Sequence, residues 1–482
     1  MNSCSTNNRI IIFLSILVMI LSRLEEGNIY VQMFSNFTLR HPQGKINSRN
    51  YYTIPLKIGT PPEVFNLQVD TSTATTWIPS ANCENCALST KLYKETSSST
   101  SSPTDNEIEL EDEDGDVKGY EISDNVILGS YKLKQFNFVQ VNKFGEDFRD
   151  YPDGKLGLGY KSSDDDFNFL ERLKKNNLIA KKIFSITTIN DKKGMLLVGD
   201  LPGKKYNTFC NVTTDTDDLD DMYRESWVCH LTHVGSFKVS KGISNIIKNY
   251  HELDNDLVSF DTAYDYIAVP ISEKEVIEKF LQKSNLKCET REKSDMQKLS
   301  KEELKLKKLK RRIREEEVSI ICEATIEELK MKGMALSFIL QGYVYSLPLD
   351  LLFVNTNENG KMEMLIRYID DDDAIWTFGY PFMNQFLTIF NMEDGQVGLK
   401  KLKKTSLPIV NINKDWEIWH RKKEGIETAG KTIAIIFLIL VIIGLTFYVY
   451  RYIRRRIEDT KRPTFDIGNN EDIENNNKNR VY

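Results

Sequence analysis

Two short segments of this chain repeat one pattern. Residues 66–72 read NLQVDTS and residues 257–263 read LVSFDTA, so each apolar strand ends in Asp-Thr and a small residue. Each is followed far downstream by apolar or bulky residues and a glycine, in residues 155–159 (KLGLG) and 376–379 (WTFG). A duplicated template of this kind predicts a two-lobed protein with one site shared between the lobes.

Two carboxyl groups at such a site predict acid–base chemistry on an amide. Asp70 and Asp261, held close together, cannot both ionise at low cost, so the pair keeps one proton. The ionised carboxylate takes a proton from an attacking water, while the protonated carboxyl hydrogen-bonds the carbonyl oxygen. We expect Thr71 and Thr262 to hydrogen-bond across the lobe junction. Small side chains at Ser72 and Ala263 leave backbone N–H groups close to the carboxylates, and this chemistry needs no metal and no cofactor.

On these residues the chain resembles the pepsin-like aspartic protease family. The resemblance implies an all-β, bilobal fold over about residues 50–404, with Asp70 and Asp261 as catalytic residues and Thr73 as a supporting residue. The motifs that carry it, in order, are residues 51–62 (YYTIPLKIGTPP), 70–73 (DTST), 77–80 (WIPS), 153–160 (DGKLGLGY), 194–200 (GMLLVGD) and 376–399.

Departures from the family pattern bear on activity. Aligning Gly119 with the glycine that ends the family's flap places Asp112 where the family carries a tyrosine, and the predicted flap tip, which includes Gly115, is strongly acidic. Such a loop favours basic over acidic peptides by charge complementarity. Tyr264 stands where a small hydroxyl residue is usual, and we expect it to crowd the C-terminal side of the site. Ser72 and Ala263 occupy positions where glycine is commoner.

The layout around this region predicts a single-pass type I membrane protein. An apolar run at residues 10–22 is typical of a secretory signal, with a signal anchor as the alternative. Residues 432–450 carry no charge and are long enough to span a bilayer, and the arginines at 451 and 454–456 place the following tail in the cytoplasm. The predicted boundaries are a signal peptide at 1–22, a short pro-segment at 23–50, an N-lobe at 51–193, a C-lobe at 194–404, a stem at 405–431, a transmembrane helix at 432–450 and a cytoplasmic tail at 451–482.

Six of the seven cysteines fall on the predicted luminal side, as expected in an oxidising compartment. The family resemblance supports the pairs Cys83–Cys86 and Cys288–Cys322, which leaves Cys210 and Cys229 as the third pair. A zinc site at Cys83 and Cys86 is disfavoured because no second ligand pair lies nearby. The sequences NFT at 36–38 and NVT at 211–213 are glycosylation acceptors.

The formal charge of −6 gives no sign of a nucleic-acid partner. A charged insertion at about residues 290–320 is indicated by the spacing between the repeated motifs, which is 87 positions from Asp70 to Gly157 but 118 from Asp261 to Gly379. Its leucine spacing predicts a solvated helical excursion. A nucleic-acid arm is the sharper alternative, and a predicted luminal location argues against it.

The predicted function is therefore that of a monomeric, membrane-anchored aspartic endopeptidase acting on protein or peptide substrates in or beyond the secretory pathway. The main alternative is a catalytically impaired pepsin-like protein that binds peptides. A third, an adhesion ectodomain, gives no reason for both Asp-Thr triplets. The shared proton suggests an acidic pH optimum, while the substrate, the cleavage site and the organelle are not encoded in any pattern that we can interpret.

Overall fold

The computed structural model describes most of the region that carries the repeated motifs. The described residues are 29–34, 37–40, 46–49, 52–83, 91–110, 116–129, 131–145, 153–161, 166–190, 193–199, 208–213, 223–241, 250–253, 256–292, 317–356, 360–370, 374–402, 407–412 and 436–455. The predicted signal peptide, the centre of the charged insertion, most of the stem and most of the cytoplasmic tail lie outside these ranges.

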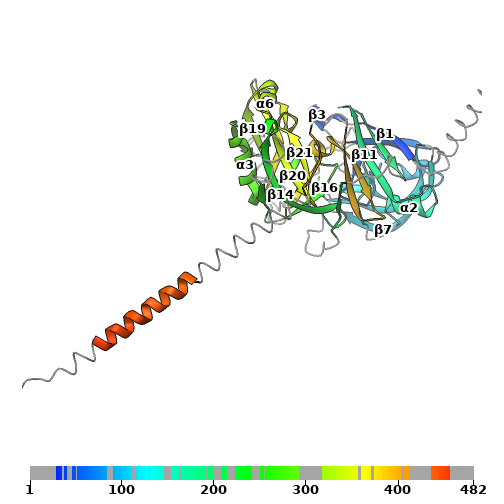
Figure 1. Cartoon of the computed structure of the whole chain (residues 1–482). Coiled ribbons are helices and arrows are strands. Elements are labelled where there is room, and N and C mark those ends of the chain that lie inside the picture. Colours follow the sequence, from blue (N-terminus) through cyan, green and yellow to red (C-terminus); the bar gives the residue numbers. More distant parts are fainter. Residues whose placement is uncertain are drawn as a thin grey trace, which may run out of the picture. The chain divides into compact units, whose positions relative to one another are not determined.

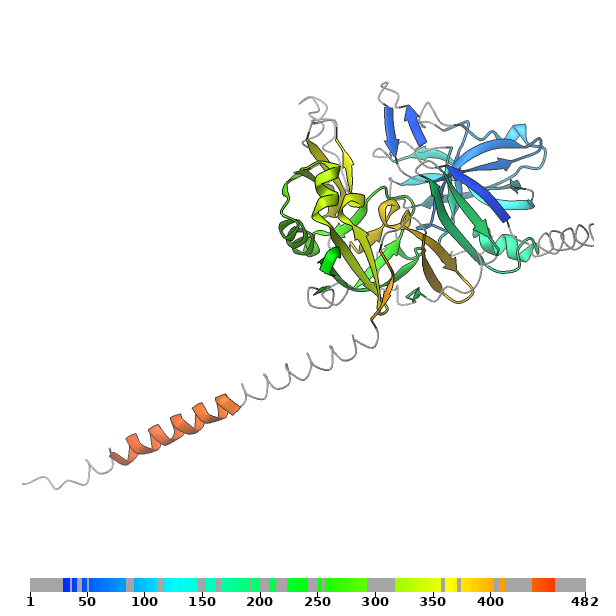
Figure 2. The same cartoon turned by 45° about the horizontal axis from the view of Figure 1, so that its top comes forward.

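Two large β-sheets make up the part that carries the motifs, so the expectation of a mostly-β fold is confirmed. The first sheet has 13 strands in the order β13-β26-β25-β11-β12-β1-β4-β5-β10-β6-β9-β8-β7, and the second has 12. Figures 1 and 2 show the blue-to-cyan strands of the first sheet beside the green-to-yellow strands of the second.

The strands of the first sheet are β1 (Ile29–Phe34), β4 (Thr53–Ile58), β5 (Glu63–Asp70), β6 (Trp77–Pro79), β7 (Ser102–Leu110), β8 (Val117–Leu128), β9 (Tyr131–Phe144), β10 (Lys155–Gly157), β11 (Ile183–Asn190), β12 (Lys193–Val198), β13 (Phe209–Asn211), β25 (Phe386–Asn391) and β26 (Gln396–Lys401). Those of the second are β14 (Val228–Lys238), β15 (Tyr250–Glu252), β16 (Leu257–Phe260), β17 (Ile267–Pro270), β18 (Lys287–Glu292), β19 (Glu317–Glu323), β20 (Met334–Leu340), β21 (Tyr343–Pro348), β22 (Phe353–Asn355), β23 (Lys361–Ile369), β24 (Trp376–Phe378) and β27 (Val410–Asn411). The helices are α2 (Phe169–Lys175), α3 (Lys274–Lys283), α6 (Ile326–Lys332) and α7 (Tyr380–Met383), and β2 (Phe37–Arg40) pairs with β3 (Ile46–Arg49).

Hydrophobic periodicity explains why these segments take the forms they do. Every second residue of β23 is buried, from Met362 to Tyr368, as expected for a strand with one face on the core. In α3 the buried residues are Val276, Ile277, Phe280 and Leu281, which share one helical face.

Strand β1 lies within the segment that the sequence assigns to a short pro-segment. It pairs antiparallel with β12, from Ile29 opposite Val198 to Phe34 opposite Lys193, and Phe34 also pairs with Thr53 of β4. Residues 29–34 are therefore an integral strand of the first sheet, inserted between β12 and β4.

The two halves of the sequence share the first sheet, because β25 of the C-lobe pairs with β11 of the N-lobe and β26 pairs with β25. Trp227 is fully buried at this junction, and its ring contacts those of Tyr160, Phe184 and Phe390. The junction between the lobes is thus part of a continuous hydrophobic core.

The charged insertion joins two paired strands. Strands β18 and β19 are antiparallel, with Glu292 opposite Val318. The predicted helix of the insertion falls outside the described residues, so the insertion stays a prediction.

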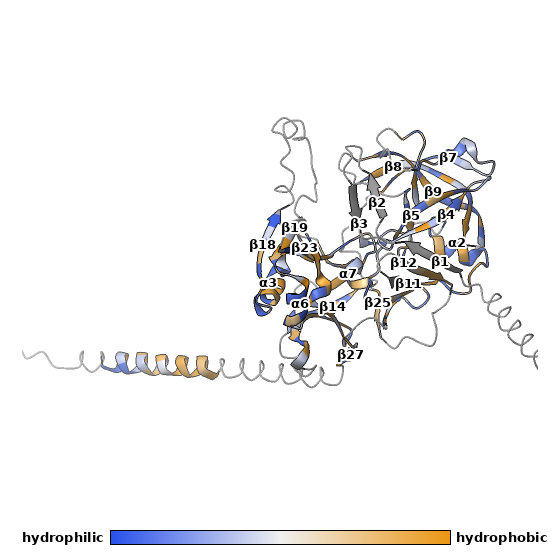
Figure 3. Ribbon diagram, turned by 90° about the horizontal axis from the view of Figure 1, so that it is seen from above, coloured by the Kyte–Doolittle hydropathy of each residue, from blue (hydrophilic) through white to orange (hydrophobic). Residues whose placement is uncertain are grey.

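A separate unit, residues 413–482, contains one described helix at Ile436–Arg455. Its 20 residues are apolar enough, over enough length, to cross a membrane, although such a helix alone is weak evidence that it does. Figure 3 shows it orange over most of its length and blue towards the end that carries Arg451, Arg454 and Arg455.

Candidate active site

The two Asp-Thr triplets lie at equivalent places in the two sheets. Asp70 is the last residue of β5, and Asp261 directly follows β16. Both side chains are buried, with exposed fractions of 0% and 3%. Each carboxyl group is thus held at the end of a rigid strand rather than on a free loop.

Reciprocal hydrogen bonds join the two triplets across the lobe junction. Thr71 Oγ1 donates to the carbonyl oxygen of Phe260 at 2.7 Å, and Thr262 Oγ1 donates to that of Val69 at 2.6 Å. The backbone N–H of Thr262 also donates to Thr71 Oγ1 at 3.1 Å. The predicted cross-lobe bonding of the two threonines is confirmed, and it brings the two carboxyl-bearing turns together.

Backbone N–H groups next to the triplets donate to both carboxyl groups. Ser72 N donates to Asp70 Oδ1 at 2.8 Å, and Ala263 N donates to Asp261 Oδ1 at 2.8 Å. Ser72 adds its hydroxyl, which donates to the same Asp70 oxygen at 2.6 Å. Hydrogen bonds of this kind favour the charged form of a carboxyl group.

The downstream glycine motifs pack directly on the triplets. Strand β10 runs parallel to β5 with Gly157 opposite Asp70, and β24 runs parallel to β16 with Phe378 opposite Phe260. A Cβ atom on Gly157 would lie 2.5 Å from the carbonyl carbon of Ala74, and one on Gly379 would lie 2.2 Å from the carbonyl oxygen of Tyr266. Only glycine permits this approach, so the repeated pattern is a packing requirement of each half-site.

A buried lysine also contacts the first carboxyl group. Lys155 Nζ lies 3.2 Å from Asp70 Oδ2, and both side chains have an exposed fraction of 0%. The contact is an ion pair by distance, and within the described part of the chain Asp70 Oδ2 accepts no hydrogen bond of ordinary geometry. The sequence analysis included Lys155 only as part of a glycine motif. The signal for this contact was a charged residue in an otherwise apolar segment.

Glu225 is a second residue that the sequence did not single out. Its Oε2 accepts hydrogen bonds from Ala74 N at 2.7 Å and from Thr73 Oγ1 at 3.1 Å. Ser226 Oγ donates to the carbonyl oxygen of Ser72 at 3.1 Å. Thr73, predicted as a supporting residue, therefore helps to fix the turn after Asp70 through Glu225.

Strands β7 and β8 form the hairpin that corresponds to the predicted flap. Asp112 and Gly115 themselves lie outside the described residues. The strand leading to them is exposed and acidic at Asp105, Glu107 and Glu109. Lys118 pairs with Glu109 at 2.7 Å, and this hydrogen bond raises the pKa of Lys118.

Tyr264, which the sequence predicts to crowd the C-terminal side of the site, is a buried residue. Its exposed fraction is 8%, and its ring meets that of Tyr266 edge-on with the centroids 5.2 Å apart. The two tyrosines form a small apolar cluster with Ala268, so the Tyr264 side chain is held by packing instead of standing free.

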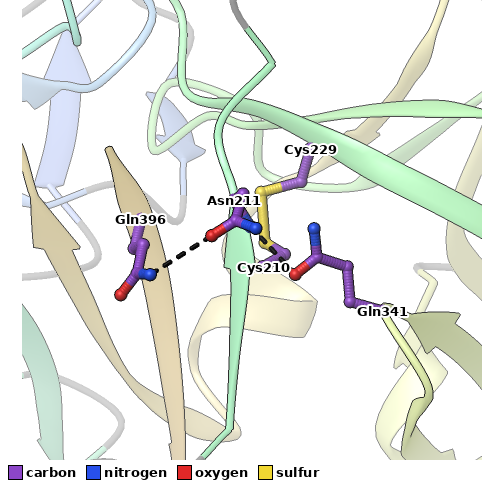
Figure 4. The surroundings of a disulfide bond; sticks show 5 residues. All are labelled: Cys210, Asn211, Cys229, Gln341 and Gln396. Atoms are coloured by element: carbon purple, nitrogen blue, oxygen red, sulfur yellow. Dashed lines mark hydrogen bonds between the residues drawn. A yellow bond between two sulfur atoms is a disulfide. The ribbon is translucent and has the colours of Figure 1, made fainter. Parts of the chain in front are cut away.

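Two of the three predicted disulfides are confirmed. Cys210 pairs with Cys229, and Cys288 pairs with Cys322. Cys83 is disulfide-bonded, while Cys86 lies outside the described residues. Figure 4 shows Asn211, the predicted glycosylation acceptor, next to the first bridge, where its Oδ1 accepts a hydrogen bond from Gln396. The other acceptor, Asn36, falls outside the described ranges.

Comparison with known proteins agrees with this geometry. The model of the family "Eukaryotic aspartyl protease" matches residues 51–402. Pregnancy-associated glycoprotein 1 of Sus scrofa is 31% identical over 153 residues, which are 30% of this chain and 39% of that protein. Plasmepsin IV of Plasmodium falciparum is 31% identical over 163 residues (31% and 35%), and cathepsin D of Gallus gallus is 32% identical over 171 residues (32% and 43%). The matched part of this chain thus spans well under half the length of these relatives.

Proposed function

The chain belongs to the eukaryotic aspartyl protease family, and on that premise we propose that it is an endopeptidase that hydrolyses peptide bonds with a water molecule held between Asp70 and Asp261. The observation that carries this proposal is the reciprocal Thr71 and Thr262 bonding, because it places two buried carboxyl groups in equivalent turns of the two lobes.

In the proposed reaction, the ionised carboxylate accepts a proton from the water as the water oxygen bonds to the amide carbon. The protonated carboxyl donates its proton to the carbonyl oxygen, which gives a neutral tetrahedral diol. The C–N bond then breaks, and the nitrogen takes up the proton that the first carboxyl group had accepted from the water. A proton of the diol returns to the second carboxyl group. One proton thus stays on the pair throughout, as expected for two adjacent carboxyl groups.

The test is cleavage of a mixed peptide library by the full-length protein in detergent, from about pH 4 to pH 7. Asp70→Asn and Asp261→Asn are the matched variants, because each replaces a carboxyl group by an amide of the same shape. We expect turnover that pepstatin blocks and that neither variant retains. A folded protein without turnover at any pH would contradict the proposal.

A pepsin-like protein that binds peptides without cleaving them is the second candidate. The buried pair of Lys155 and Asp70 favours it, because the ammonium group competes with the shared proton for the carboxylate. Binding of library peptides that survive intact would support this candidate over the first.

We also propose that the enzyme prefers basic residues in its substrates. The exposed carboxylates of β7 lie on the hairpin that leads to the predicted flap, and they attract cationic side chains. A library preference for Lys and Arg that weakens in an Asp105→Asn, Glu107→Gln double variant is the expected result. An unchanged preference would show that the carboxylates of β7 do not determine the specificity.

For location, we propose a type I membrane protein whose helix Ile436–Arg455 anchors a monomeric, luminal or extracellular catalytic region. The arginines at the end of the helix support a cytoplasmic tail. The expected result is that alkaline carbonate leaves the full chain in the membrane pellet, while protease added to sealed vesicles removes only the tail. Release by carbonate would contradict the anchor.

A further inference from the structure

The two half-sites follow one template but differ in charge. Counting back from the repeated glycine, Lys155 of the N-lobe corresponds to Thr377 of the C-lobe, since each lies two residues before Gly157 or Gly379. Thr377 is buried and hydrogen-bonds Ser259 of its own neighbouring strand at 3.0 Å. Lys155 instead extends its ammonium group to the carboxylate of Asp70. A neutral position in one lobe is therefore a buried cation in the other.

The two half-sites also differ in the number of hydrogen bonds that the small residue after Asp-Thr donates to the carboxyl group. Ser72 donates both its N–H and its hydroxyl to Asp70 Oδ1. Ala263, at the equivalent position, offers Asp261 a backbone N–H but has no hydroxyl. The hydroxyl and the cation both lie on the N-lobe side, and both contact the carboxyl group of Asp70.

Three other titratable groups of the described residues near Asp70 have partners of their own. Glu225 accepts from Ala74 N and Thr73, and Asp153 accepts from Asn66 N at 2.7 Å and Lys91 N at 2.9 Å. The Tyr52 hydroxyl is 2.8 Å from Thr188 Oγ1, and strand β6 contributes no titratable side chain. Across the junction, Asp261 is the carboxyl group of the equivalent turn.

Resting on the proposed function, we propose that Lys155 is a positioning residue that makes the two aspartates unequal. Its ammonium group holds Asp70 as the ionised member, so that Asp70 takes the proton from water and Asp261 carries the proton given to the carbonyl oxygen. The cation also favours loss of the shared proton, and so it confines activity to a more acidic range than the carboxyl pair alone would show.

The first test is the pH profile of kcat/KM for the full-length protein with Lys155→Met and Lys155→Gln, which remove the charge and shorten the side chain by one atom. An opposite charge at this distance moves a carboxyl titration by about 1 to 3 pH units. We therefore expect the alkaline limb of both variants to move up by about that amount. Lys132→Met, at an exposed lysine of the same lobe, is the matched control and leaves the limb unchanged.

The second test needs no turnover. Melting temperatures of Lys155→Met, Asp70→Asn, Asp261→Asn and the two double variants that contain Lys155→Met give two double-mutant cycles. We expect strong non-additivity for Lys155 with Asp70 and near-additivity for Lys155 with Asp261, at a pH where carboxyl groups are ionised. This coupling should fade at low pH, where carboxyl groups are protonated.

The outcomes separate the two proposals. A wild-type protein that is folded but inactive refutes the protease and leaves the cycles to decide the role of Lys155. An active enzyme whose Lys155→Met variant loses rate equally at every pH, with the limb in place, overturns the positioning role and leaves Lys155 as a packing residue. Coupling of Lys155 to Asp261 instead of Asp70 overturns the assignment of the ionised member.

Discussion

The hydroxyl of Thr71 bridges two backbone groups of the opposite lobe, and its removal is the sharpest test of the junction. Thr71→Val keeps the side-chain shape but strips a donor from the carbonyl oxygen of Phe260 and an acceptor from the N–H of Thr262. Each buried group left without a partner costs about 1–3 kcal/mol, so we expect Thr71→Val to lower the free energy of unfolding by about 2–6 kcal/mol. Thr262→Val strips one such partner, that of Val69, and should cost about 1–3 kcal/mol.

The assay is urea unfolding of the full-length protein in detergent, followed by tryptophan fluorescence. Trp77, Trp227 and Trp376 are fully buried and so report on both lobes and their junction. Thr71→Ser is the control, because it keeps the bridging hydroxyl and should stay close to the wild type. If Thr71→Val is as stable as Thr71→Ser, or if Thr262→Val is the more damaging change, the reasoning about a bridging hydroxyl is wrong.

Three further changes test other parts of the structure. Gly379→Ala puts a Cβ 2.2 Å from a backbone oxygen, so it should lower the free energy of unfolding by more than about 4 kcal/mol or prevent folding. Gly360→Ala, in open space at a φ of +74°, should lower it by about 1–2 kcal/mol. Expression level and urea midpoint measure both changes, and equal effects would contradict the packing argument. Replacing Cys210 and Cys229 together by serine should lower the free energy of unfolding by about 2–5 kcal/mol, and a urea midpoint equal to that of the wild type under oxidising conditions would show that the bridge adds no stability. Burial raises the pKa of Tyr52, so the stability contributed by its protonated phenol is fully present below about pH 10 and is lost as the pH rises towards the raised pKa of the folded state. Tyr52→Phe should reduce this alkaline loss of stability in melting curves recorded over a series of pH values. An equally steep loss in the variant would contradict the role given to the phenol.

Much of the site could be predicted from the sequence because each half-site is a local pattern. An apolar strand ending in Asp-Thr, and a glycine that must pack on the turn, are both readable in a few consecutive residues, as Asp70 with Gly157 and Asp261 with Gly379 illustrate. The cross-lobe threonine bonds followed from the same duplication.

What the sequence did not reveal depends on contacts between distant residues. Nothing local to Lys155 says that its side chain turns towards Asp70, and Glu225 reaches the turn after Asp70 from 151 positions further along the chain. Likewise, a strand at Ile29–Phe34 could not be separated from a pro-segment, because its identity comes from pairing with β12.

The backbone conformation shows what the small residue after each Asp-Thr contributes to its half-site. Glycine is the commoner choice there, but among the described residues the non-glycine positions with positive φ are Gln135, Asn177, Asn285 and Gln341. Neither Ser72 nor Ala263 therefore adopts a backbone conformation that favours glycine. Ser72 thus introduces no left-handed strain and adds a hydroxyl donor to Asp70, whereas Ala263 adds none to Asp261. Duplication sets the two carboxyl groups in matching turns, and Ser72 and Lys155, two of the positions where the copies diverge, place a hydroxyl and a cation next to Asp70 that can give the two carboxyl groups different tasks.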